Sequence, residues 1–272
     1  MVSDGPLVLP GLQVVLENAP KAELDRLLAE NRMSADPWIG PQNILIVNTG
    51  RHLVLIDTGM GDRSKVLGPN NGRLLGNMQL AGIDPATIDV VAITHAHIDH
   101  CWALVDARDR LNVPNARVAI SMADYDFWTQ ESLLQNPAAR DFVLYTRTNL
   151  LPVRDRLIPV RDGSEVVPGI TAMATAGHTV GHHSYVIESE GKRLINVGDV
   201  FHHHVLLLQH PEWHNIFDSD KAAGAATRRR VAEMLASSGT MTAMYHFPYP
   251  GIGTVARQGN GFVWLPAPMF ET

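Results

Sequence analysis

The feature that most constrains this chain is a His-x-His-x-Asp-His hexapeptide at residues 95–100. It directly follows residues 90–94, a mostly apolar run that is typical of a buried strand. A loop that leaves a strand and turns can point several side chains inward. Imidazole and carboxylate together suit zinc, iron, manganese or nickel rather than calcium, which takes only oxygen ligands. The hexapeptide therefore predicts a site for such a metal at the end of a strand.

Later segments supply the ligands that one loop cannot. Two metals need about seven protein ligands and a bridging water. His178, Asp199 and His246 each follow a strand-like run. Glycines at positions 177, 181 and 198 allow close backbone approach or positive φ where a side chain would clash. These segments are therefore the best candidates for completing a binuclear site.

In this order, the motifs resemble those of the metallo-β-lactamase superfamily, and the resemblance runs from about Asn43 to the C-terminus. It implies an α/β (α+β) fold, a four-layer αβ/βα sandwich with the metals between the edges of two sheets. Residues 53–59 echo residues 193–199, a trace of a two-fold construction. We expect a single domain over residues 1–272, with an N-terminal extension at about residues 1–42.

The resemblance also implies a set of metal ligands. They are His95, His97 and His178 for the first ion, Asp99, His100 and His246 for the second, and Asp199 for both. The two divalent ions are expected to be zinc, with manganese, iron or cobalt as alternatives. Asp57 resembles a buried aspartate that supports the metal loop without binding metal.

A binuclear site of this kind predicts hydrolysis without a covalent enzyme intermediate. A hydroxide shared by two divalent metals has a strongly lowered pKa and attacks at neutral pH, while the metals polarise the carbonyl or phosphoryl oxygen. Asp99 would be both a ligand and a catalytic residue that accepts and returns a proton. No Gly-x-Ser-x-Gly nucleophile motif is present. The predicted substrate is therefore a small ester-like molecule.

The residue at position 202 helps to distinguish between possible ester substrates. In the N-acyl homoserine lactonase branch, a tyrosine usually stands three residues after the bridging aspartate and contacts the substrate carbonyl. Here that position is His202, to which we assign a catalytic role. Segments 198–202, 246–253 and 261–266 instead resemble the branch that contains methyl parathion hydrolase. An organophosphate or aryl ester and a lactone both remain open as substrates.

Four aromatic residues flank the metal motifs and are candidates for substrate binding: Trp128, Phe247, Trp38 and Tyr249. Ligand pockets are mostly apolar with few polar anchors, so such side chains could clasp an acyl chain or an aryl leaving group. The N-terminal segment around Trp38 could also mediate formation of a homodimer, as it does in the resembling branch.

The sequence leaves three other functions open. An N-acyl homoserine lactonase acting in quorum quenching fits the same ligands. A β-lactamase fits less well, because that branch is typically exported and residues 1–10 show no secretory signal. A mononuclear-iron oxidoreductase resembling persulfide dioxygenases would need only part of the ligand set.

Composition limits the partners. The chain has 22 Lys and Arg against 28 Asp and Glu, and no basic stripe, so we expect a small-molecule substrate and no nucleic acid. Arg228-Arg229-Arg230 is interpreted as the solvated face of a helix. No apolar run approaches membrane-spanning length, so we expect no membrane association and a cytoplasmic location.

The remaining pattern alternates strands and helices. We expect a helix at 19–33, a hairpin of 44–48 with 53–56, a helix at 71–81, a strand at 117–121, helical segments from 123 to about 150, and a helix at 219–238 capped by Ser219.

Overall fold

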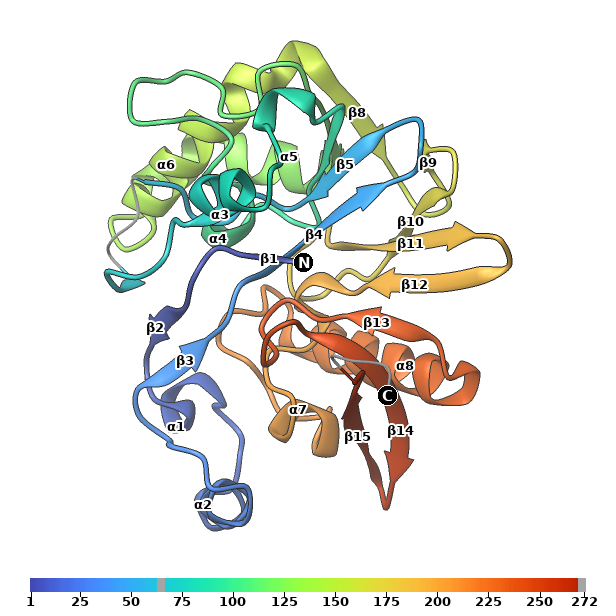
Figure 1. Cartoon of the computed structure of the whole chain (residues 1–272). Coiled ribbons are helices and arrows are strands. Elements are labelled where there is room, and N and C mark those ends of the chain that lie inside the picture. Colours follow the sequence, from blue (N-terminus) through green and yellow to red (C-terminus); the bar gives the residue numbers. More distant parts are fainter. Residues whose placement is uncertain (63–66, 269–272) are drawn as a thin grey trace.

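Two β-sheets face each other, and helices cover their outer faces (Figure 1). The computed structural model describes residues 1–62 and 67–268. The first sheet has the strand order β1 (Val2–Ser3), β4 (Asn43–Asn48), β5 (Leu53–Ile56), β6 (Val90–Ala92), β7 (Arg117–Ser121) and β8 (Leu157–Val160). The second has the order β15 (Gly261–Pro266), β14 (Ile252–Gln258), β13 (Met241–Ala243), β12 (Lys192–Asn196), β11 (His183–Ser189), β10 (Ile170–Ala174) and β9 (Glu165–Val167).

The helices divide between the two sheets. Those grouped around the first sheet are α3 (Leu74–Leu80), α4 (Ile98–Cys101), α5 (Met122–Thr129) and α6 (Arg140–Leu150), whereas α7 (Leu206–Gln209) and α8 (Lys221–Ser238) lie beside the second (Figure 1). Short 3-10 turns are η2 (Pro85–Thr87), η3 (Glu131–Gln135), η4 (Leu151–Arg156) and η5 (Gly198–Val200). The predicted helical region 123–150 is thus broken into α5, η3 and α6.

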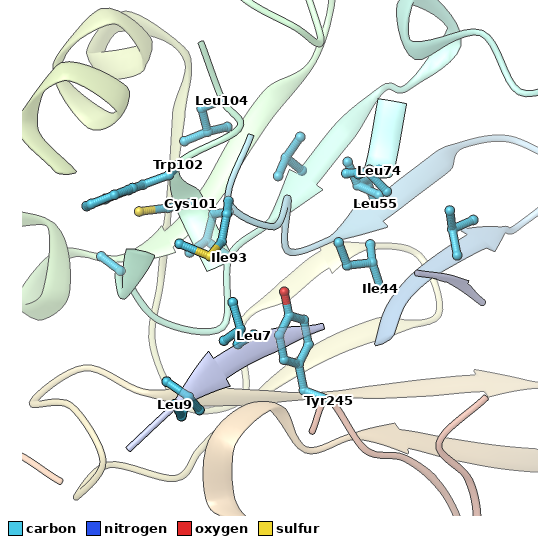
Figure 2. Packing of buried hydrophobic residues seen from close by; sticks show 14 of the residues in the cluster. Leu7, Leu9, Ile44, Leu55, Leu74, Ile93, Cys101, Trp102, Leu104 and Tyr245 are labelled. Carbon is cyan, nitrogen blue, oxygen red and sulfur yellow. The ribbon is translucent and has the colours of Figure 1, made fainter. Parts of the chain in front are cut away.

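Three separate hydrophobic cores lie between these layers. One joins the first sheet to its helices and contains Leu55, Ile93 and Trp102 (Figure 2). A second joins the two sheets, and a third joins the second sheet to α8. Three apolar interfaces require four layers, so the predicted αβ/βα sandwich is confirmed.

Alternation along the strands explains how one sheet can serve two cores. In β5, Leu55 packs with the helices while Val54 and Ile56 face the other sheet. In β7, Ala119 faces the other sheet and its neighbours Val118 and Ile120 face the helices. Successive strand side chains point to opposite faces, so a strand that is apolar throughout must be covered on both sides.

The polar motifs lie where parallel strands end. β5 pairs in parallel with β6, and β12 pairs in parallel with β13. Asp57 follows β5, the hexapeptide follows β6, Asp199 follows β12, and His246 follows β13. Because neighbouring parallel strands end at the same edge, each sheet brings two polar segments together, and the facing sheets bring all four to one place.

Residues 1–42 are built into this architecture. β1 adds to the first sheet through antiparallel pairing with β4. β2 (Leu7–Leu9) pairs with β3 (Trp38–Gly40), and α1 (Leu12–Val15) and α2 (Lys21–Glu30) lie between them in the chain. The inward residues of this ribbon, including Leu7 and Leu9, belong to the core of the first sheet (Figure 2). Among the described residues, no helix is long and apolar enough to cross a membrane.

The structure corrects two details of the last helix. α8 begins at Lys221, and its cap is the carboxylate of Asp220, which accepts from the Ala223 amide, rather than Ser219. The interpretation of Arg228 as a solvated residue is wrong, because its side chain is 1% exposed. Its guanidinium donates to Asp218 and to the carbonyls of Pro211 and Trp213. One face of α8 points into the protein, and position 228 lies on it.

Replacing Arg228 by methionine should lower the free energy of unfolding by about 3–5 kcal/mol, because the buried carboxylate of Asp218 would lose its counter-ion. Urea unfolding of the metal-free protein measures this loss. Arg229→Met is the matched control: the Arg229 side chain is 49% exposed, and its loss should cost about 0.5 kcal/mol or less. Equal small losses in both variants would contradict the assigned role of Arg228.

Candidate metal centre

The carboxylate of Asp199 lies at the centre of a group of buried histidines. Its Oδ2 atom is 3.2 Å from His246 Nε2, 3.3 Å from His100 Nε2 and 3.5 Å from His178 Nε2. His95 Nε2 is 3.8 Å away on the same side of the cluster as His178. The segments that carry these side chains come from both sheets, so the cluster spans the edge where the sheets meet.

The predicted ligands fall into two sets that share no residue. In each set the donor atoms lie within 4.8 Å of one another, and the sets are His95, His97 and His178, and Asp99, His100, Asp199 and His246. The structure thus brings together all seven predicted ligands. Asp199, predicted to serve both ions, belongs to the second set, and its Oδ2 atom lies 3.5 Å from His178 Nε2 of the first. A third set, His178, Asp199 and His202, includes a histidine that was not predicted as a ligand.

The donors at this cluster suit divalent cations. Among the described residues, His95 Nε2, His100 Nε2 and Asp199 Oδ1 are buried and have no hydrogen-bond partner. Buried polar atoms are rarely left in this state without a reason. Imidazole nitrogens together with carboxylate oxygens match the ligand chemistry of zinc and its first-row neighbours. The cluster could therefore hold two such ions.

Asp57 holds the hexapeptide loop in place, as its resemblance to the supporting aspartate of the superfamily implied. Its carboxylate accepts from the Thr94 amide at 2.8 Å and faces His100 Nδ1 at 2.9 Å. The contact fixes the ring so that His100 Nε2 points to the cluster. Asp57 itself has a φ of 64°, a backbone conformation that residues other than glycine seldom adopt. The surrounding hydrogen bonds hold it there.

Two supporting carboxylates were missed from the sequence. Asp218 Oδ1 lies 2.9 Å from His178 Nδ1, and its other oxygen pairs with the buried Arg228. Asp124 accepts from the backbones of both histidine loops. Neither lies in a recognisable metal motif, although Asp218 stands in a short Asp-Ser-Asp run before α8. His182 accepts from the Asp199 amide through Nε2.

Burial and charge set the protonation of these groups. Burial lowers the pKa of His95 and His97 well below the usual range and the pKa of His202 to about 4. Those rings are neutral at pH 7, the form that binds metal. Burial also acts to raise the pKa of Asp99, but the attraction of His100 outweighs it and holds the pKa at about 2.

A cavity of about 400 Å³ opens onto the cluster. Its polar wall is made of the metal-site residues His97, Asp99, His178, Asp199, His202 and His246. Its apolar wall is made of Leu7, Leu9, Pro10, Leu67, Ile98, Trp128, Ala138, Ala139, Phe142 and Phe217. Within the described part of the chain, no lysine or arginine contributes to this lining. The cavity suits an uncharged substrate with an apolar group.

The four predicted substrate-binding aromatics lie in different places. Trp128 lines the cavity, with its ring centroid 5.4 Å from that of His97. Trp38 is buried with its ring 6.2 Å from that of His246, but it does not line the cavity. Phe247 is completely buried in the core beside α8, and Tyr249 lines a separate hollow near β15. Only Trp128 of the four is placed to touch a molecule in the cavity.

Comparison with known proteins agrees with this geometry. Residues 37–237 match the family model of the metallo-beta-lactamase superfamily. The chain belongs to the metallo-beta-lactamase superfamily, and it is a metal-dependent hydrolase with a centre suited to two divalent ions. An N-acyl homoserine lactonase of Bacillus cereus is 26% identical over 189 residues, which are 61% of this chain and 68% of that protein.

Two solved structures are similar over almost the whole chain. The dizinc quorum-quenching lactonase AidC, in complex with a product, superposes with a TM-score of 0.92 at 28% identity, covering 99% of this chain and 94% of its own. The hydrolase AbOPH has a TM-score of 0.90 at 25% identity, with the same coverage.

Removing metal with a chelator should lower the thermal stability of the protein, and returning zinc should restore it. Free zinc at about 100 times its dissociation constant would contribute about 2.7 kcal/mol per site. Asp199→Ala should bind fewer than two ions and show a much smaller shift in Tm, as elemental analysis and differential scanning calorimetry would report. Full metal content in that variant would contradict the central position of Asp199.

Proposed function

We propose that this protein is a dizinc lactonase that opens the ring of N-acyl homoserine lactones. The observation that carries the proposal is the cavity, in which a His and Asp cluster forms one wall and apolar side chains form the other. A lactone ring placed at the cluster leaves its acyl chain against the apolar wall. The similarity to AidC and to the Bacillus cereus lactonase supports the same substrate class.

The lining also argues against the alternatives. Because no arginine or lysine of the described residues lines the cavity, an anionic group that lies away from the metals, such as the carboxylate of a β-lactam, would be desolvated without a basic side chain to pair with. A neutral lactone with an amide-linked chain avoids this cost. The full set of seven clustered ligands also favours two metals over the single iron of an oxidoreductase.

We further propose zinc as the metal and the seven clustered residues as its ligands, because histidine nitrogen and carboxylate oxygen are its common donors. Two bound divalent ions would lower the pKa of a shared water and polarise the lactone carbonyl. Asp99, which both lines the cavity and belongs to the second ligand set, would accept and return the proton that moves between water and the leaving alkoxide.

His202 would position the substrate carbonyl. It lines the cavity, its Nε2 is 3.2 Å from Asp199 Oδ2, and its Nδ1 is buried without a hydrogen-bond partner among the described residues. An imidazole N–H at this place can donate to the carbonyl oxygen as negative charge develops on it.

The direct test compares kcat/KM of the zinc-loaded protein on N-hexanoyl homoserine lactone and on a methyl-parathion-type triester. A strong preference for the lactone is expected. A preference for the triester would instead assign the aromatic wall of Trp128, Phe142 and Phe217 to an aryl leaving group. Low rates on both substrates would overturn the proposed substrate class.

His202→Ala should lower kcat on the lactone by about 100-fold, the effect of losing one donor to a developing oxyanion. Its metal content should stay unchanged. His204→Ala is the matched control, since His204 lines the separate hollow near β15 and should leave kcat within a factor of two or so of wild type. Loss of metal in the His202 variant would make this residue a ligand instead.

Ala139→Leu should shorten the acyl chain that the cavity accepts. Ala139 lines the apolar wall just before α6, and a leucine there would occupy part of the space of a long chain. We expect kcat/KM to fall about tenfold or more for a decanoyl lactone relative to a butanoyl lactone. Ala22→Leu, at an exposed position in α2, serves as the control. An unchanged chain-length profile would place the acyl chain elsewhere.

A further inference from the structure

One face of α5 contacts both loops that carry the ligands of the first metal. Asp124 is fully buried in the first turn of this helix. Its Oδ2 atom accepts from the Ala96 amide at 2.8 Å and from the Thr179 hydroxyl at 2.9 Å. Its Oδ1 atom accepts from the Gly181 amide at 2.7 Å. Ala96 lies between His95 and His97, and Thr179 follows His178.

The same face of α5 makes a second contact with these loops, through Trp128. Trp128 lies one helical turn after Asp124, so both side chains project from the same side of α5. The Trp128 ring meets the His97 imidazole edge-on, at 5.4 Å between centroids. The loop after His178 also approaches the backbone of α5 closely. A Cβ added to Gly181 would lie 2.6 Å from the Asp124 backbone nitrogen. Glycine at 181 is therefore required for α5 to pack against this loop.

The two loops need such a connection. His97 and His178 are 81 residues apart, yet His97 Nδ1 lies 2.8 Å from His178 Nε2. Among the described residues, one backbone hydrogen bond joins the segments next to these loops, from the His183 amide to the Thr94 carbonyl, and neither residue is a predicted ligand. Asp124 joins the loops at the ligands themselves.

We propose that Asp124 is a positioning residue that fixes the spacing of the His95–His97 loop and the His178 loop, and so sets the affinity of the first metal. A carboxylate suits this role because both its oxygens accept hydrogen bonds, and all three partners are donors. An asparagine would turn one of its NH₂ hydrogens toward an N–H or O–H donor. The inference rests on the proposed ligand set.

Asp124→Asn should weaken the binding of the first metal by about tenfold to a hundredfold, the usual effect of losing a group that orients a ligand. Competition with a chromophoric chelator measures zinc affinity directly. The cobalt-substituted protein should also show an altered absorption spectrum, because the geometry of the three histidines changes. Both readouts are independent of turnover.

Asp4→Asn is the matched control for simple destabilisation. Asp4 is also a fully buried carboxylate that accepts from three backbone amides, those of Met60, Gly72 and Leu74. None of these amides lies in a ligand loop. Asp4→Asn should therefore lower the Tm of the apo and zinc-loaded proteins equally, with wild-type metal affinity, whereas Asp124→Asn should also reduce the increase in Tm that zinc produces.

Thr179 gives a test that does not depend on the stability of the Asp124 variant. Thr179→Val removes one of the three hydrogen bonds to Asp124 and should weaken the binding of the first metal by several-fold. Thr179→Ser keeps the hydroxyl and should bind this metal with wild-type affinity. Wild-type affinity in both Asp124→Asn and Thr179→Val would overturn the role of Asp124. A wild-type protein that binds no pair of metals would instead overturn the proposed function.

Discussion

The packing of five histidine rings around the carboxylate of Asp199 is the constraint on which the rest of the site depends. Its carboxylate lies within 3.8 Å of five imidazole nitrogens, in a place shielded from water. Such a group of acids and bases is stable only if each ring is oriented and if cations share the available lone pairs. The hydrogen bonds of Asp57, Asp218 and His182 hold His100, His178 and the Asp199 backbone respectively. The buried polar residues around the centre therefore form one connected support.

The sequence was a good guide wherever chemistry and chain order coincide. The hexapeptide at 95–100 follows a strand, and a turn after a strand has few ways to place its side chains. His178, Asp199 and His246 could be grouped with it because their order resembles that of a known superfamily, and the structure brings them together. The same resemblance implied the four layers, and the structure gives their physical reason: β5 and β7 are apolar on both faces and lie between two cores.

The sequence was a poor guide wherever a role depends on a partner distant in the chain. The sequence predicts that Arg228 is exposed together with Arg229 and Arg230. Only the packing of α8 shows that Arg228 pairs with Asp218. Phe247 follows His246, but in the turn after β13 its side chain enters the core beside α8 instead of the cavity. Asp124 lies in a helix with no metal motif. Its contact with the histidine loops follows only from the fold, which places the amides of residues 96 and 181 beside its carboxylate.

The two halves of the molecule contribute unequally to the apolar wall of the cavity. The clustered histidines and aspartates come from loops of both sheets and are held by buried hydrogen bonds. Seven of the ten apolar lining residues come from the N-terminal ribbon and from the segment between β7 and β8. These parts lie outside the strands that carry the ligands, so their side chains can change without disturbing the metals. The exception is α5, where Trp128 lines the cavity and Asp124 holds the histidine loops. At this helix, a change in substrate preference is physically tied to the geometry of the metal site.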